Sequence, residues 1–128
     1  MTGEDLRVLL VEDVDDNRYL ARCLLENAGH VVEEALNGAD ALDRAHRAHP
    51  DVILLDMSLP IVDGWEVLRR LQADPSLAAI PVVALTAHAM AGDRERILEA
   101  GARGYIPKPL NVPNFVQQVV ACTDPRCT

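Results

Sequence analysis

Aromatic residues, cysteines, basic residues and long apolar runs are all scarce in this 128-residue chain. Aromatic residues make up only 3%, so a hydrophobic core must be built from Val, Leu, Ile and Ala. No apolar run approaches the roughly 20 residues that a membrane-spanning helix needs. With 12 basic and 20 acidic residues the formal net charge is −8. That charge argues against nucleic acid or an anionic membrane as a direct partner.

Cysteine usage and the first residues indicate the compartment. Cys23, Cys122 and Cys127 form neither an even set nor a spacing typical of metal ligands. The opening residues MTGEDLR lack the basic and apolar segments of a secretory signal. These observations favour reduced thiols and a cytoplasmic location. A hydrophobic content of 49% with 25% charged residues is typical of a globular protein, and the length fits one domain.

Apolar runs typical of β-strands alternate with helical patterns along the chain. Short runs rich in Val, Ile and Leu predict strands over 7–12, 51–56, 81–86 and 104–108, and a less regular run over 30–35 predicts a strand near an edge. Apolar residues at helical spacing predict helices over 16–29, 38–49, 64–72, 92–101 and 111–121. The alternation predicts one α/β domain over residues 1–128, with a core at about 6–121, a short tail over 122–128, and a parallel sheet covered on both faces.

Polar residues stand where the predicted strands end. Glu12 and Asp13 close the first strand, whereas Asp56, Thr86 and Lys108 close three others. Because the carboxyl ends of parallel strands meet at one edge of a sheet, we expect these five side chains to converge. Crowded carboxylates without nearby Cys or His ligands favour a hard cation such as Mg²⁺, and lysine and threonine suit a phosphate. A single carboxylate there could merely mark a strand leaving the core, but the set favours a binding site.

Four segments together resemble the receiver domain of bacterial two-component response regulators. They are the acidic pair at 12–13, the block LLDMSLPIVDG at 54–64, the segment ALTA at 84–87 and the segment YIPKPL at 105–110. The resemblance extends from about Leu6 to Ala121. It implies a flavodoxin-like, doubly wound α/β fold whose five-stranded parallel sheet has the order 2-1-3-4-5, with five helices.

The resemblance also implies a phosphoacceptor and a metal site. Asp56 would accept a phosphoryl group from a phosphohistidine on a sensor histidine kinase or a histidine phosphotransferase. Asp13, Asp56 and the backbone carbonyl of Ser58 would bind Mg²⁺, and Glu12 would contribute through water. The protein would then be a signalling phosphoacceptor rather than an enzyme, although it would assist its own phosphorylation and dephosphorylation.

The same resemblance assigns a switch. Lys108 would pair with Asp56 and later with its phosphate, and the peptide bond between Lys108 and Pro109 is expected to be cis. Thr86 would move to bond a phosphate oxygen, and Tyr105 would turn inward behind it. The face formed by the fourth helix, fifth strand and fifth helix would then bind a protein output target.

Loop residues near the strand ends have narrower expected roles. Pro60 and Gly64 would shape the loop after Asp56, and Gly64 is expected to adopt a backbone conformation that a Cβ would hinder. His88, two residues after Thr86, would either limit the access of water to the acyl phosphate or simply face solvent.

Three alternatives remain beside this interpretation. A phosphohydrolase of the haloacid-dehalogenase type would need a second aspartate where Ser58 stands, and 128 residues leave no room for its cap domain. A degenerate receiver would bind partners without phosphorylation, although all five site residues are present here. Within the receiver class, the chain would act either as a stand-alone, diffusible allosteric messenger or as a relay intermediate that passes the phosphoryl group to a histidine phosphotransferase.

Overall fold

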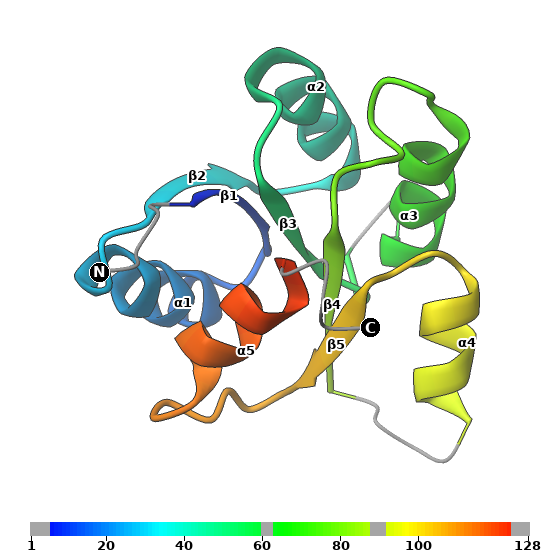
Figure 1. Ribbon diagram of the computed structural model, residues 1–128. Coiled ribbons are helices and arrows are strands. Elements are labelled where there is room, and N and C mark those ends of the chain that lie inside the picture. The colour runs from blue at the N-terminus through cyan, green and yellow to red at the C-terminus, as the bar shows by residue number, and fades with distance from the viewer. Residues whose placement is uncertain (1–5, 60–62, 88–91, 124–128) are drawn as a thin grey trace.

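A computed structural model describes residues 6–59, 63–87 and 92–123 of the chain. Within these residues five strands alternate with five helices (Figure 1). Their bounds are β1 Arg7–Val11, α1 Asp15–Asn27, β2 Val31–Ala35, α2 Gly38–Ala48, β3 Val52–Asp56, α3 Gly64–Ala73, β4 Val82–Thr86, α4 Asp93–Glu99, β5 Gly104–Pro107 and α5 Phe115–Thr123. None of the helices in this part of the chain combines the length and apolar composition needed to cross a lipid bilayer.

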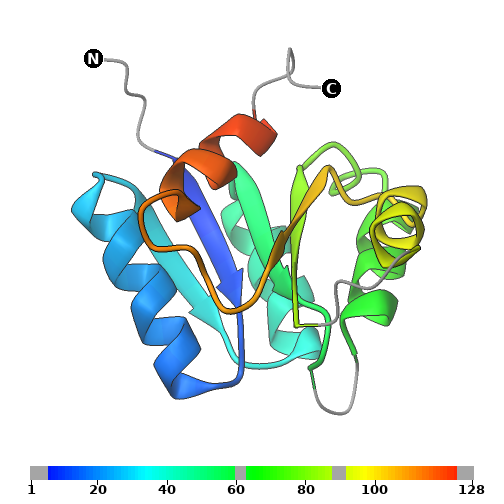
Figure 2. The ribbon, with the colours of Figure 1, turned by 90° about the horizontal axis from the view of Figure 1, so that it is seen from below.

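The strands form one parallel sheet in the order β2-β1-β3-β4-β5, as the sequence predicted. Figure 2 shows the strand arrows running in a common direction, with helices on both sides of the sheet. The less regular strand β2 lies at an edge, and β3 lies in the centre between β1 and β4. All the carboxyl ends of the strands therefore point to the same edge of the sheet.

Two apolar layers hold the helices to the sheet, and their residues alternate along the strands. Ile53 and Leu55 of β3 face the layer that contains α2, α3 and α4, whereas Val52 and Leu54 face the layer that contains α1 and α5. This alternation follows from the two-residue period of a β-strand. Every residue of β3 is buried, including the terminal Asp56. A strand packed on both faces holds the residue at its end with little freedom to move.

Helix and strand boundaries differ from the predicted ones at the C-terminal side. Helix α5 begins at Phe115 rather than at residue 111. The carbonyl of Asn111 accepts hydrogen bonds from the N–H groups of Asn114 and Phe115, so the segment before the helix forms a turn. Strand β5 ends at Pro107, and Lys108 follows it directly. Pro107 lacks an N–H, so it suits the end of an edge strand.

Candidate functional site

Backbone hydrogen bonds continue the sheet just beyond the strand ends and fix the residues there. The N–H of Glu12 donates to the carbonyl of Ala35 at 3.1 Å, and the N–H of Lys108 donates to the carbonyl of Thr86 at 2.7 Å. Asp56 is itself the last residue of β3, and its side chain is buried. The sheet therefore holds the backbone at Glu12, Asp56 and Lys108, whereas Asp13 lies in the loop that follows β1.

Three carboxylates meet at this edge. One carboxylate oxygen from each of Glu12, Asp13 and Asp56 lies within 4.8 Å of the others. Glu12 and Asp56 are buried, whereas Asp13 is exposed to solvent. Hard oxygen donors at this spacing can hold a hard divalent cation, and the exposed Asp13 leaves an approach from water. The convergence that the sequence suggested for these residues is present in the structure.

Lys108 reaches into the same cluster from the end of β5. Its Nζ lies 2.9 Å from Oε1 of Glu12 and 3.2 Å from Oδ1 of Asp56, and only 16% of its side chain is exposed. The lysine therefore contacts Glu12 as well as the Asp56 partner expected from the sequence. The peptide bond between Lys108 and Pro109 is cis.

Burial and neighbouring charges shift the protonation of this cluster. Burial raises the pKa of Glu12, and the Asp56 charge acts in the same direction against the opposing effect of Lys108. Burial alone would lower the pKa of Lys108, but the two carboxylates outweigh it and raise that pKa. Three carboxylates and one ammonium leave a formal surplus of two negative charges. A divalent cation would balance that surplus.

The loop after Asp56 packs tightly against helix α3. The N–H of Ser58 donates to Oδ1 of Asp56 at 3.0 Å, which orients the carboxylate. A Cβ on Gly64 would lie 2.4 Å from Cα of Met57 and 2.6 Å from the carbonyl oxygen of Asp56. A Cβ at Gly64 would be hindered, as expected, and the cause is this contact with the backbone of the preceding loop and not a positive φ angle. Pro60 lies outside the described residues.

Thr86 lies at the end of β4, where its carbonyl accepts the hydrogen bond from Lys108, and Tyr105 lies on the neighbouring strand β5 opposite Ala84. Thr86 is buried at the end of β4 and lines a cavity of about 150 Å³, together with Ser58, Trp65, Arg96 and others. Tyr105 is half-buried on β5, and the guanidinium of Arg94 lies 5.9 Å from the centroid of its ring. The movements expected of Thr86 and Tyr105 remain predictions, and His88 lies outside the described residues.

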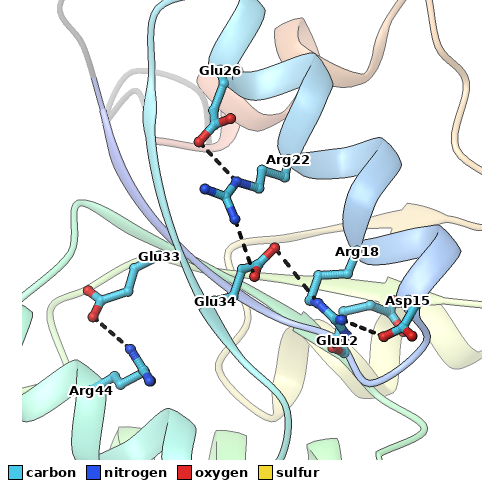
Figure 3. A network of polar contacts seen from close by, with 8 residues as sticks. All are labelled: Glu12, Asp15, Arg18, Arg22, Glu26, Glu33, Glu34 and Arg44. Carbon is cyan, nitrogen blue, oxygen red and sulfur yellow. Dashed lines mark hydrogen bonds and ion pairs between the residues drawn. The ribbon is translucent and has the colours of Figure 1, made fainter.

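Arg18 is a residue near the site that the sequence did not single out. Its Nη1 donates to the backbone carbonyl of Glu12 at 3.1 Å, and its guanidinium also pairs with Asp15 (Figure 3). Nε of Arg18 lies 3.7 Å from Oε2 of Glu34 on β2. The sequence shows only a basic residue on the helix that follows the acidic pair. Such residues are common on solvated helix faces, so the position of Arg18 alone did not indicate a role at the site.

Comparisons with known proteins agree on one family. A model described as the response regulator receiver domain matches residues 8–120. Proteins described as polar-differentiation response regulator DivK, from Brucella ovis and Brucella anthropi, are 46% identical to the chain over 112 residues. The match covers 88% of this chain and 91% of each relative.

Solved structures give the same picture. A putative response regulator from Chloroflexus aurantiacus has a TM-score of 0.88 at 28% identity, covering 94% of this chain and 98% of that one. Chemotaxis response regulator CheY4 of Vibrio cholerae has a TM-score of 0.87 at 27% identity, covering 93% and 99%. The receiver domain of a sensor histidine kinase from Pseudomonas aeruginosa, described with a magnesium ion coordinated in its active-site cleft, has a TM-score of 0.84 at 32% identity, covering 94% and 98%.

Proposed function

The chain belongs to the response regulator receiver domain family of two-component signalling, and from this premise we propose that Asp56 is its phosphoacceptor. The observation that carries the proposal is the position of Asp56. Its carboxylate is buried at the end of the central strand, oriented by the N–H of Ser58 and paired with Lys108. Glu12 is also buried, oriented by a backbone N–H and paired with Lys108, but it follows β1, whereas Asp56 ends the central strand β3.

The proposed reaction is transfer of a phosphoryl group from a phosphohistidine. A carboxylate oxygen of Asp56 attacks the phosphorus, the P–N bond breaks, and the imidazole leaves with the bonding electron pair. Catalysis of such a transfer consists mainly of positioning and of neutralising charge on the equatorial oxygens. Lys108 supplies one positive charge beside Asp56 and can follow the phosphate oxygens while it stays near Glu12.

We propose Mg²⁺ as the cation for the acidic cluster. Asp13, Asp56 and the backbone carbonyl of Ser58 would hold it, and Glu12 would contribute through water. The spacing of the carboxylates, their surplus charge and the all-oxygen donor set support this choice. With the ion held by these residues, its positive charge would offset the repulsion between the carboxylates and an incoming phosphoryl group. Asp13 would leave the ion open to solvent, through which the phosphodonor must approach.

The proposed output depends on Thr86 and Tyr105. Phosphorylation would add roughly two negative charges beside the hydroxyl of Thr86. Thr86 would then bond a phosphate oxygen, and Tyr105 would fill the space behind it. Tyr105 faces Ala84 in the β4–β5 register and contacts Arg94 of α4, so its movement would alter the surface of α4, β5 and α5. That surface would bind the protein output target.

The proposed donor of the phosphoryl group is a sensor histidine kinase or a histidine phosphotransferase. The proposed location is the cytoplasm, where such kinases present their phosphohistidine. In this role the chain is not an enzyme acting on a separate substrate, because the phosphoryl group stays on its own Asp56. We favour an allosteric messenger, which would use the surface of α4, β5 and α5 described above to bind its output target. Rapid phosphoryl transfer from this protein to a histidine phosphotransferase would instead support a relay.

Intact-mass spectrometry after incubation with Mg²⁺ and acetyl phosphate tests the proposal. We expect a gain of one phosphoryl group that disappears when EDTA is added at the start or when Asp56 is replaced in Asp56→Asn. Asp51→Asn is a matched control, because Asp51 is an exposed aspartate just before the same strand. A wild-type protein that gains no mass, under conditions in which acyl phosphates survive, would overturn the proposal in favour of a degenerate receiver.

A further inference from the structure

Two arginines on helix α1 reach the same carboxylate of strand β2. Arg18 and Arg22 are four residues apart and so lie on one face of the helix. Nε of Arg18 lies 3.7 Å from Oε2 of Glu34, and Nη1 of Arg22 lies 3.4 Å from Oε1 of the same residue (Figure 3). Both arginines thus join α1 to the edge strand with similar geometry. Their other contacts differ.

Arg18 also contacts the loop after β1, which carries two of the three metal-site carboxylates, Glu12 and Asp13. Its Nη1 donates to the carbonyl oxygen of Glu12, and its Nη2 pairs with Asp15. Arg22 instead contacts Glu26 on its own helix at 3.0 Å. The side chain of Arg18 is 16% exposed, compared with 43% for Arg22. Arg18 therefore lies between the edge strand and the loop, whereas Arg22 lies farther toward solvent.

The carbonyl that Arg18 contacts belongs to the peptide between Glu12 and Asp13. The orientation of this peptide decides where the two side chains point. In the next peptide along the loop, the N–H of Val14 donates to Oε2 of Glu12 at 3.2 Å. A planar guanidinium can contact Glu12, Asp15 and Glu34 at once, which a single ammonium group cannot do in the same geometry.

We propose that Arg18 is a positioning residue that fixes the Glu12–Asp13 peptide and thereby presets the carboxylates for Mg²⁺. This inference rests on the proposed metal site and adds a residue that does not itself touch the ion. Mg²⁺ requires near-ideal octahedral geometry, whereas Ca²⁺ accepts flexible and irregular coordination. Loosening the peptide should therefore weaken Mg²⁺ binding more than Ca²⁺ binding.

The positioning role and a purely electrostatic role of Arg18 predict opposite results. A cation near an acidic cluster repels Mg²⁺, so removing only its charge would tighten the binding of both divalent ions to a similar degree. Removing a positioning contact would weaken binding instead. Loss of outer-shell partners of metal ligands typically lowers affinity by about 10–100-fold. Because Arg18 contacts the backbone and not a ligand atom, we expect the lower end of that range.

Isothermal titration calorimetry of Mg²⁺ and of Ca²⁺ tests this inference on the full chain. We expect Arg18→Ala to weaken Mg²⁺ binding by about tenfold, the low end of the range for outer-shell partners. Ca²⁺ binding should weaken clearly less. Arg18→Lys keeps the charge but loses the planar fork, so its ratio of Mg²⁺ to Ca²⁺ affinity should fall as well. Arg22→Ala is the matched control, because it removes an arginine contact to Glu34 without touching the loop. Its affinity ratio should equal that of the wild type.

Three outcomes would overturn the inference: tighter Mg²⁺ binding in Arg18→Ala, an equal change for both ions, or a wild-type ratio in Arg18→Lys. Circular dichroism confirms that each variant is folded at the titration temperature, and the lysine variant provides the test if the alanine variant is not.

Asp13→Ala separates this inference from the proposed function. If the wild type does not bind Mg²⁺, or Asp13→Ala binds it equally well, the proposed site fails. If Asp13→Ala loses binding and Arg18→Ala does not, only the role of Arg18 fails.

Discussion

Replacing Asp13 with asparagine should stabilise the metal-free protein while it removes most of the response to Mg²⁺. The Asp13 carboxylate lies within 4.8 Å of those of Glu12 and Asp56, and Lys108 already pairs with both of these. Two like charges at this distance repel by about 0.9 kcal/mol in water and by about 3.5 kcal/mol at an effective dielectric constant of 20. Because Asp13 is exposed, the lower figure applies to each pair.

Two such repulsions, partly offset by attraction to Lys108, predict that Asp13→Asn raises the free energy of unfolding by about 1 kcal/mol. For a domain of this size, that change corresponds to a rise in Tm of about 4 °C. With Mg²⁺ at 100 times its Kd, the wild type should gain about 2.7 kcal/mol of stability. The variant should gain far less at the same concentration, because it has lost a carboxylate ligand.

Thermal unfolding followed by circular dichroism, in EDTA and then in Mg²⁺, measures both effects. Asp16→Asn is the matched control, because it removes an exposed charge from the first turn of α1, where an acidic residue favours the helix dipole. That variant should lose a little stability and keep the full Mg²⁺ response. An Asp13→Asn protein that is less stable than the wild type in EDTA would refute the claim that the carboxylates are crowded.

Three further predictions follow from contacts at the site. Gly64→Ala should lower the free energy of unfolding by about 1–3 kcal/mol, because a Cβ there meets the backbone of Met57; wild-type stability in urea would contradict this. Lys108→Met should cost about 3 kcal/mol in EDTA, since it leaves the buried Glu12 and Asp56 without their cation, and Mg²⁺ should restore part of the loss. Chemical denaturation of Lys108→Met with and without Mg²⁺ measures both effects. A denaturation midpoint in EDTA equal to that of the wild type would contradict these ion pairs. The raised pKa of Glu12 means that the metal-free folded state holds a proton above pH 4.5 that the unfolded state releases. The free energy of unfolding without metal should therefore fall as the pH increases above 4.5, and the affinity for Mg²⁺ should rise. Calorimetry at several pH values measures both quantities, and values that do not change with pH would contradict this reasoning.

Sequence patterns predicted the sheet and the convergence of the site because both follow from backbone periodicity. Alternating strands and helices with short connections allow few topologies, and parallel strands bring their carboxyl ends to one edge. The placement of Asp56 follows from an apolar run that must be buried on both faces. These features depend on the order of elements and not on side-chain detail.

The remaining features of the site depend on contacts between side chains and backbone that no sequence spacing specifies. Nζ of Lys108 lies 2.9 Å from Glu12 and 3.2 Å from Asp56, and the sequence spacing does not indicate the contact with Glu12. The expected hindrance of a Cβ at Gly64 is present, but it arises from the approach of α3 to the end of β3, which a local pattern does not specify. Arg18 was missed because an arginine on an amphipathic helix is usually solvated, and its carbonyl partner carries no signal in the sequence.

The most direct test of the account is to locate the phosphoryl group after phosphorylation with Mg²⁺ and acetyl phosphate. Borohydride reduces an aspartyl phosphate to homoserine, and peptide sequencing by mass spectrometry then identifies the modified position. We expect homoserine in place of Asp56 alone. Modification of Asp13, of a histidine, or of several positions to a similar degree would contradict it.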